Sequence, residues 1–423
     1  MKRLFYIFLV LFTSIPILAQ NKPDYSKIDL MLIRGDYKSA VDTCSQILAS
    51  DSLNSEVYFK QGLACQNLIM EDKSLDCFIR AATISPDNNN YNFTLAKSYF
   101  NKGKTSKAKP LLLKLCASDS LSWPYAYYLT GIYMLEGKYK ESIKIYYRFY
   151  KKDYNNFMYA DKIGFAYLRN GDFDFAIDMF ERSLKLNPRN TNAIKNLAYL
   201  YAGTVSADSA VKLLTKGIEI DSTDMDLYAR RAAINFKRNN FKKALPDYLT
   251  LLNSGDSSVL NLKRTGIGYA KFLKPKEAVF YLLKAYKADT TDLETISVLA
   301  QNCVQIRDKN SAIFYYKKLL TMLDPYETQI GLNYILLAEV LKSDDRNAEA
   351  IEAYVKSQKY RSDTSVLMII ANLYDEKLKD GPKAIRYYEM YLNRIKNSKN
   401  EYDSDYTESV KKRIESLKKQ NVR

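Results

Sequence analysis

Basic and amide side chains recur at a fixed spacing in the middle of the chain. Four of them repeat with a period of 34: Lys162, Asn196, Arg230 and Arg264. Three further lysines accompany them: Lys195, Lys263 and Lys271. Lysine and arginine donate charge-assisted hydrogen bonds to carboxylates, so these residues could bind an acidic polypeptide if repeated elements present them on equivalent faces. A solvated charged face is the alternative interpretation.

The chain contains no histidine. This excludes histidine-assisted serine or cysteine hydrolysis and zinc sites that use histidine. A hydrolase with two catalytic carboxylates would not need histidine, but several acidic residues stand where turns and helix starts are expected, which favours helix capping. Examples are Asp51, Asp221, Asp224 and Asp292. We therefore predict a non-catalytic protein without a cofactor or metal site.

Small residues recur with the same period of 34. One series is Gly62, Ala96, Thr130, Gly164, Ala198, Ala232, Gly266 and Ala300. A second series runs twelve positions later, from Ser74 through Ala108, Ser142, Ala176, Ala210, Ala244 and Ala278 to Ala312. Where two helices cross closely, a larger side chain would force their axes apart. The period therefore indicates a repeat of closely packed helices.

Apolar residues between the small positions follow helical spacing, so each period contains two helices. Glycines stand where the first helix of a pair must end and where a left-handed backbone is needed. They are Gly35, Gly103, Gly137 and Gly171. The two helices of a pair should therefore be antiparallel and joined by a short turn.

The repeat resembles the tetratricopeptide family in its period of 34 and in its pattern of small, aromatic and late proline positions. Residues 157–190 match this pattern best. The matching positions are Gly164, Tyr167, Gly171, Ala176, Phe180 and Pro188. The resemblance implies an all-α, right-handed superhelical solenoid of about 11 antiparallel helix pairs over residues 20–392. Nine units run from about residue 21 to 326. An insertion near 325–330 precedes the tenth unit. It is the one place where the superhelix could break, but a local adjustment is expected there rather than a domain boundary. The eleventh unit has one extra residue between its helices.

Residues 393–423 are expected to form a polar linker and a capping helix. Asp405 and Glu408 make a capping box, and Tyr406, Val410, Ile414 and Leu417 form one apolar stripe. The other face is basic: Lys411, Lys412, Arg413, Lys418 and Lys419. A stack of repeats needs a terminal cap with a polar outer face, and a basic helix lying on a membrane surface is the alternative.

Residues 1–19 have the order of a secretory signal peptide. Lys2 and Arg3 precede an apolar run, which ends at Ala19 after a break at Thr13 to Pro16. We therefore expect an exported protein, periplasmic or secreted, without a membrane-spanning segment after cleavage. The formal charge of +16 allows nucleic acid, anionic membranes or acidic proteins as partners, and export makes nucleic acid the least expected of these.

Five cysteines are an odd number for an oxidising compartment and do not indicate a disulfide framework. Cys65 and Cys77 stand on consecutive helices of one repeat and could approach each other. The alternative is that all five are small buried residues.

In the tetratricopeptide family the first helix of each pair lines a concave groove that binds other proteins. Applied here, this frame places Phe59, Phe93, Tyr127 and Phe165 in an aromatic half of the groove and the basic residues in the other half. The aromatic residues could equally pack between neighbouring repeats. The resemblance implies a protein-binding scaffold of the bacterial cell envelope that holds an extended partner segment. The alternatives are a glycan-binding protein or an accessory component of secretion or outer-membrane assembly.

Overall fold

The computed structural model describes residues 25–204, 206–323, 327–396 and 404–420, and these residues form helices and connecting turns with no strand. The predicted all-α solenoid of about eleven helix pairs is confirmed. The chain divides into two compact units, residues 1–188 and 189–423. This division falls between two repeats, and the insertion near 325–330 lies within the second unit. The predicted signal peptide, residues 1–19, lies outside the described residues.

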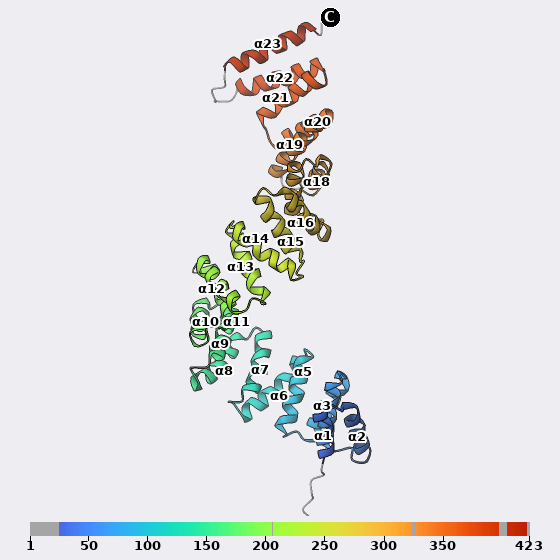
Figure 1. The fold of residues 1–423 in the computed structure, drawn as a ribbon, viewed down its shortest axis with the longest axis vertical. Coiled ribbons are helices and arrows are strands. Elements are labelled where there is room, and N and C mark those ends of the chain that lie inside the picture. The colour runs from blue at the N-terminus through green and yellow to red at the C-terminus, as the bar shows by residue number, and fades with distance from the viewer. Residues whose placement is uncertain (1–24, 205, 324–326, 397–403, 421–423) are drawn as a thin grey trace, which may run out of the picture. The chain divides into compact units, whose positions relative to one another are not determined.

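Unit 1 contains five antiparallel helix pairs (Figure 1, blue to green). The helices are α1 (Ser26–Arg34), α2 (Tyr37–Ser50), α3 (Ser55–Asn67), α4 (Glu71–Ile84), α5 (Asn89–Asn101), α6 (Thr105–Ser118), α7 (Trp123–Leu135), α8 (Tyr139–Lys152), α9 (Phe157–Asn170) and α10 (Phe173–Leu186).

Unit 2 contains six further pairs and a terminal helix (Figure 1, green to red). The first four pairs are α11 (Thr191–Thr204), α12 (Ala207–Ile220), α13 (Met225–Lys237), α14 (Phe241–Asn253), α15 (Val259–Lys271), α16 (Pro275–Ala288), α17 (Leu293–Gln305) and α18 (Lys309–Met322). The remaining helices are α19 (Glu327–Ser343), α20 (Asn347–Tyr360), α21 (Thr364–Asn372) with a π-helical turn η1 (Leu373–Lys377), α22 (Gly381–Lys396) and α23 (Ser404–Gln420).

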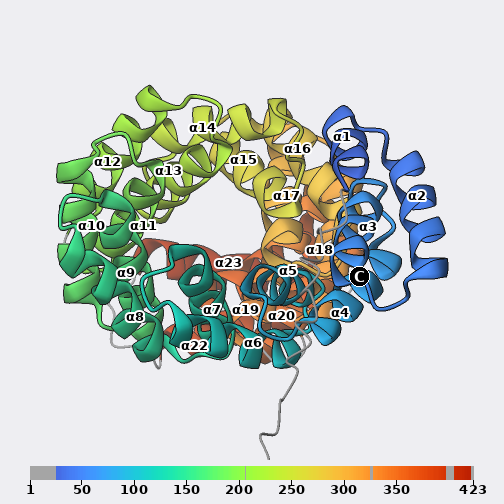
Figure 2. The same cartoon turned by 90° about the horizontal axis from the view of Figure 1, so that it is seen from below.

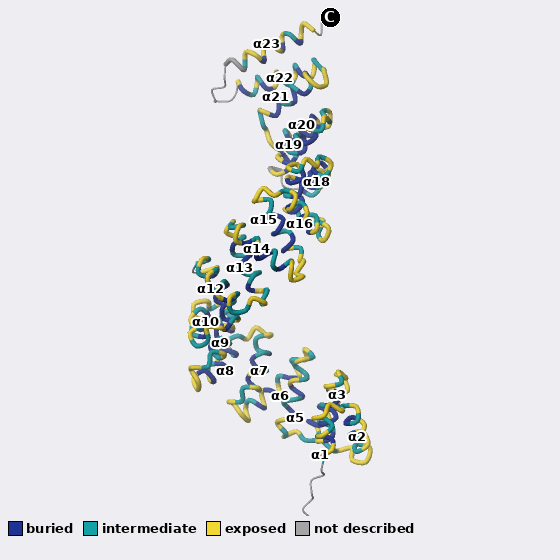
Figure 3. Tube along the Cα trace, in the orientation of Figure 1, coloured by how far each residue is buried: buried dark blue, intermediate teal, exposed yellow. Residues whose placement is uncertain are grey.

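The small positions are buried at the crossings of paired helices, as predicted. Alanines at these positions, such as Ala96, Ala176 and Ala300, have no exposed surface. A Cβ atom added to Gly62 would lie 2.5 Å from the Phe78 ring, which is closer than side chains pack. The period of small residues therefore sets how closely the two helices approach. Figure 3 shows the resulting stripes of buried residues along the helices of both units.

In the turns that the structure describes, each first helix is followed by a left-handed residue, as predicted for Gly35, Gly103, Gly137 and Gly171, whose φ angles are 79°, 70°, 72° and 87°. The same position in other repeats holds a residue with a side chain. These residues are Ile69, Asn239, Leu273, Arg307, Asp345 and Lys379, with φ between 55° and 63°. The turn therefore keeps one backbone shape, although this shape is unfavourable for residues other than glycine.

Both irregular repeats accommodate their extra residues inside a first helix. α19 has 17 residues where α17 has 13, so the four inserted residues extend α19 by about one helical turn. In the eleventh repeat the extra residue was expected in the turn between the helices, and this expectation was wrong. It lies in η1, because a π-helical turn holds one more residue than an α-helical turn while the helix continues.

α23 covers the end of the last helix pair with the predicted apolar stripe. Val410, Ile414 and Leu417 are buried against a cluster that includes Tyr388 and Tyr391. The side chain of Asp405, and with it the predicted capping box, lies outside the described residues.

The basic residues of α23 were expected to face solvent, but two of them contact the last helix pair. Arg413 donates hydrogen bonds of 2.8 and 2.7 Å to the buried carboxylate of Asp375, and Lys418 lies 2.9 Å from Glu389 on α22. They are oriented toward the last helix pair because it supplies these carboxylates.

Candidate functional site

The inner side of unit 2 is formed by the first helices of its repeats. In Figure 2, α11, α13 and α15 lie on the inside of the curve of this unit, and α12, α14 and α16 lie outside. Asn196, Arg230 and Arg264 stand at equivalent positions of α11, α13 and α15, so three of the four residues that repeat with a period of 34 belong to these inner helices. The fourth, Lys162, is on α9 and belongs to unit 1.

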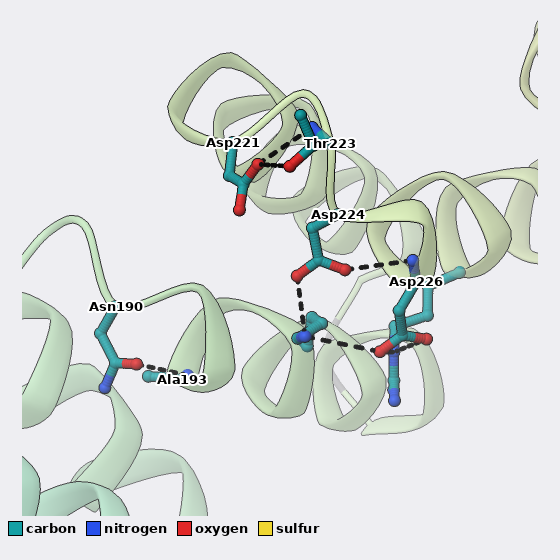
Figure 4. A network of polar contacts seen from close by, with 8 residues as sticks. Asn190, Ala193, Asp221, Thr223, Asp224 and Asp226 are labelled. Carbon is teal, nitrogen blue, oxygen red and sulfur yellow. Dashed lines mark hydrogen bonds and ion pairs between the residues drawn. The ribbon is translucent and has the colours of Figure 1, made fainter. Parts of the chain in front are cut away.

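Lys195 is paired with carboxylates of the next repeat. Its Nζ atom lies 2.8 Å from Asp224 and 3.7 Å from Asp226. Asp224 also caps α13, because its other carboxylate oxygen accepts a hydrogen bond of 3.1 Å from the backbone N–H of Asp226 (Figure 4). The side chains of Lys195 and Asp224 are only 17% and 18% exposed, so this pair joins successive repeats.

Lys263 repeats this arrangement two repeats later. It lies 2.9 Å from Asp292 and 2.7 Å from Glu294, and Asp292 caps α17 by accepting from the N–H of Thr295. Burial disfavours the charge on Lys263, but hydrogen bonds to both carboxylates outweigh it and raise the pKa of the ammonium group. Burial also opposes the charge on Asp292, yet Lys263 and Thr295 lower the pKa of its carboxyl group. Both groups are therefore charged at neutral pH, and each has a partner within the chain.

The two arginines differ in how firmly they are held. Arg230 is bonded to Asp226, one turn earlier on α13, at 3.0 Å on the exposed surface, where such a pair contributes little. Arg264 donates a hydrogen bond of 2.9 Å to the Tyr248 hydroxyl, and its guanidinium lies 5.5 Å from the Phe236 ring centroid. Arg264 is thus oriented by its neighbours.

A shallow depression lies beside Arg264. Its lining consists of Ala233, Ile234, Phe236 and Lys237 from α13, together with Arg264 from α15. Sequence reasoning did not single out this apolar surface. Phe236 occupies the same position of its repeat as Phe100, four periods earlier. An aromatic residue at this position could therefore have been found from the repeat pattern.

The remaining basic and amide candidates are less constrained. Asn196 is half-buried on α11, and Lys271 is exposed at the last residue of α15. Lys162 in unit 1 lies with its Nζ atom 5.9 Å from the Tyr127 ring centroid.

The aromatic candidates of unit 1 separate into two groups. Phe59 stacks on Tyr91 of the next repeat with centroids 4.7 Å apart, and Phe93 lies 5.0 Å from Tyr125. These two phenylalanines therefore pack between neighbouring repeats, as the alternative interpretation held. Tyr127 and Phe165 are exposed.

The cysteines provide no activated nucleophile. All five are free, and Cys44, Cys65, Cys77 and Cys303 are buried. Burial raises the pKa of the Cys44 thiol to about 11 and those of Cys77 and Cys303 to about 12, so the reactive thiolate is disfavoured.

Within the described residues there is no group of three or more acidic or cysteine residues that could hold a metal ion. No described helix is long and apolar enough to span a bilayer.

The tetratricopeptide repeat family model matches residues 159–190, which cover most of α9 and α10. The chain is a tetratricopeptide repeat protein. Proteins of this family are generally non-catalytic scaffolds for protein–protein interaction. A search of curated proteins found no match to this tetratricopeptide repeat chain.

Solved structures with some likeness are also tetratricopeptide repeat proteins. The C-terminal part of one from Cytophaga hutchinsonii is 15% identical, with a TM-score of 0.44, and the match covers 57% of this chain and 97% of that one. One from Parabacteroides merdae is 16% identical, with a TM-score of 0.40 and coverage of 60% and 97%. YrrB, described as a TPR protein with an unusual peptide-binding site, is 16% identical, with a TM-score of 0.37 and coverage of 44% and 96%.

Proposed function

We propose that the chain is a non-catalytic scaffold that binds an extended, acidic segment of another protein along the inner side of unit 2. We also propose that it works in the bacterial cell envelope, periplasmic or secreted, after removal of residues 1–19. The observation that carries the binding proposal is the surface around Arg264. An oriented guanidinium lies beside an apolar depression, and Arg230 and Asn196 stand at the equivalent positions of the two preceding first helices.

The proposed contacts have a clear division of roles. Arg264 would bind a carboxylate while an adjacent apolar side chain of the partner enters the depression at Phe236 and Ile234. Lys195 and Lys263 would hold successive repeats in register, because their charges already have carboxylate partners. The binding surface is therefore narrower than the basic sequence pattern predicts.

The glycan-binding alternative is less well supported. Stacking on a sugar ring needs a flat, exposed aromatic side chain. Trp123, the only tryptophan, packs among Tyr127, Tyr146, Phe149 and Tyr159, with ring centroids 4.9 to 6.3 Å apart. Its ring is occupied by contacts within the protein.

The test is crosslinked co-purification from the cell envelope, followed by affinity measurements with the protein recovered. Arg264→Glu should weaken binding about tenfold or more, because a charged hydrogen bond beside the apolar depression, where water is partly excluded, is worth roughly 1.5 to 3 kcal/mol. Lys419→Glu, on the exposed face of α23, is the control with the same change in charge. If both reversals act equally, binding depends on a diffuse positive field and the groove proposal is wrong. Recovery of a glycan or detection of a chemical turnover would contradict the scaffold proposal itself.

A further inference from the structure

The outer faces of α16 and α18 each present a phenylalanine at the same place in the repeat. Phe280 is 54% exposed and Phe314 is 55% exposed. The equivalent residues of the other second helices are charged or proline: Asp42, Asp76, Pro110, Lys144, Asp178, Lys212, Pro246, Glu352 and Arg386. This position therefore faces solvent throughout the solenoid, and packing within the repeat does not require an aromatic residue there.

The same two helices are strongly basic. α16 and α18 contain six lysines and one acidic residue, Glu277. The lysines are Lys276, Lys284, Lys287, Lys309, Lys317 and Lys318. Within the described part of the chain, two of these six lysines have ion pairs: Lys309 with Asp344 at 3.6 Å and Lys317 with Glu349 at 3.5 Å. The patch formed by the two phenylalanines and these lysines therefore carries an uncompensated positive charge.

Lysine stems and aromatic rings lie together in this patch. The Nζ atom of Lys284 is 4.3 Å from the Phe280 ring centroid, so the ammonium group sits over the ring. Lys318 lies 5.8 Å from the Tyr286 ring. Long lysine side chains can keep their charge in a polar layer while their methylene groups cover an apolar surface.

The composition of the patch favours a lipid surface over a protein partner. Protein–protein interfaces are enriched in arginine and depleted in lysine, and specific carboxylate recognition uses the planar fork of arginine. α16 and α18 contain no arginine. Membrane-surface helices combine lysine with phenylalanine, and anionic headgroups attract lysine without needing a defined geometry.

We propose that α16 and α18 form a peripheral contact with an anionic lipid surface. Phe280 and Phe314 enter the boundary between headgroups and acyl chains, and the unpaired lysines face the lipid phosphates. The contact uses the second helices and leaves the first helices of unit 2 accessible to a polypeptide. It is therefore independent of the proposed scaffold function and can fail or succeed separately from it.

The test is sedimentation of the purified chain with phosphatidylcholine vesicles, with and without phosphatidylglycerol. We expect binding only to the anionic vesicles, weakened by added salt. Phe280→Ser with Phe314→Ser should reduce the partition coefficient by at least about tenfold. Phe175→Ser is the matched control, because Phe175 is an exposed phenylalanine on the second helix α10 but stands among Asp174 and Asp178. It should leave binding unchanged.

A charge test gives a second, independent readout. Lys284→Glu with Lys318→Glu should abolish vesicle binding, whereas Lys242→Glu with Lys243→Glu on neighbouring α14 makes the same change in net charge and should reduce it only slightly. Circular dichroism of all variants should match the wild type, because the substituted side chains contribute little to the core. Absence of wild-type binding to anionic vesicles, equal loss in either control, or binding to polyglutamate without binding to vesicles would overturn the proposal.

Discussion

The crossing between the two helices of a repeat has different side chains in the two units. In unit 1, α9 and α10 place Ile163 and Met179 there, and both are buried and apolar. Two repeats later, α13 and α14 of unit 2 place Arg231 and Asp247 there. The guanidinium donates two hydrogen bonds of 2.9 and 2.7 Å to the carboxylate and a third of 3.0 Å to the Thr215 hydroxyl.

This comparison shows what the repeat requires. Asp247 is only 3% exposed, so its charge has lost nearly all contact with water. Bidentate hydrogen bonding offsets that cost, and Thr215 connects the pair to α12 of the preceding repeat. The repeat therefore demands two complementary side chains at this crossing and does not demand that they be apolar.

Breaking the pair should have the largest effect of the changes considered. Asp247→Ala leaves the Arg231 guanidinium partly buried without its carboxylate, and we expect a loss of about 3 to 5 kcal/mol in the free energy of unfolding. Urea unfolding followed by circular dichroism measures the loss. Arg231→Ile with Asp247→Met recreates the pair of unit 1 and should be neutral or more stable than the wild type. A double variant as unstable as Asp247→Ala would show that the ion pair is needed for packing in unit 2.

The small position allows a second comparison between the units. A Cβ atom at Gly266 would lie 2.5 Å from Leu282 and 3.2 Å from the carbonyl oxygen of Ala278, whereas at Gly164 it would lie 3.0 Å from the Phe180 ring. Overpacking costs roughly 1 to 3 kcal/mol, and alanine gains about 1 kcal/mol over glycine within a helix. We expect Gly266→Ala to destabilise by about 1 to 2 kcal/mol and Gly164→Ala to be nearly neutral. Thermal unfolding of both variants tests this order, and the reverse order would contradict it.

The turn residues differ between the units as well. Gly171 in unit 1 and Leu273 in unit 2 occupy the same left-handed position, with φ of 87° and 55°. A side chain in this conformation costs roughly 1 to 2 kcal/mol, and glycine has its own entropic cost of roughly 0.5 to 1 kcal/mol. Leu273→Gly should therefore stabilise by about 0.5 to 1 kcal/mol in thermal unfolding, and Gly171→Leu should destabilise by a similar amount. Destabilisation by Leu273→Gly would mean that the exposed leucine makes a compensating contact.

Repetition explains how much of the fold could be predicted from the sequence. A residue type that recurs with a period of 34 reports a packing requirement, so the small residues and the helix pairs could be located from their period. A feature that departs from the repeat in one place only has no period and cannot be located in this way. The π-helical turn η1, which holds one extra residue, and the left-handed backbone at Ile69 both run against the local preference of the chain, so neither could be predicted from residue type.

The candidate site was predicted less well, because charge pairing depends on contacts between repeats. The sequence identified Lys195 and Lys263 as basic and Asp224 and Asp292 as capping residues. It did not reveal that these residues pair with each other 29 positions apart. Arg264 was identified, but its orientation comes from Tyr248 and Phe236, whose rings surround it only in the folded structure.

The smallest expected effect concerns a second bidentate pair, between Arg413 of α23 and Asp375. Unlike the pair in α13 and α14, this pair is partly exposed to solvent, because the Arg413 side chain is 45% exposed. Hydrogen bonds from Arg413 hold the pKa of the Asp375 carboxyl below its ordinary value, although burial acts in the opposite direction. Since the pKa is lower in the folded state, the pair contributes fully at neutral pH, above the unfolded value of about 4. Its contribution is lost as the pH falls through the folded value.

Docking of α23 should therefore weaken below about pH 4. Hydrogen exchange of the α23 amides, corrected for the intrinsic effect of pH and compared with α6 in unit 1, measures this change. Asp375→Asn should lower the protection of α23 at neutral pH by about 1 kcal/mol or less, because Arg413 is partly solvated. It should also remove the part of the acid response that belongs to this carboxyl group, while leaving α6 unchanged. If α23 loses protection in acid to the same extent in the wild type and in the Asp375→Asn variant, the apolar contacts of Val410, Ile414 and Leu417 hold the helix and the ion pair does not.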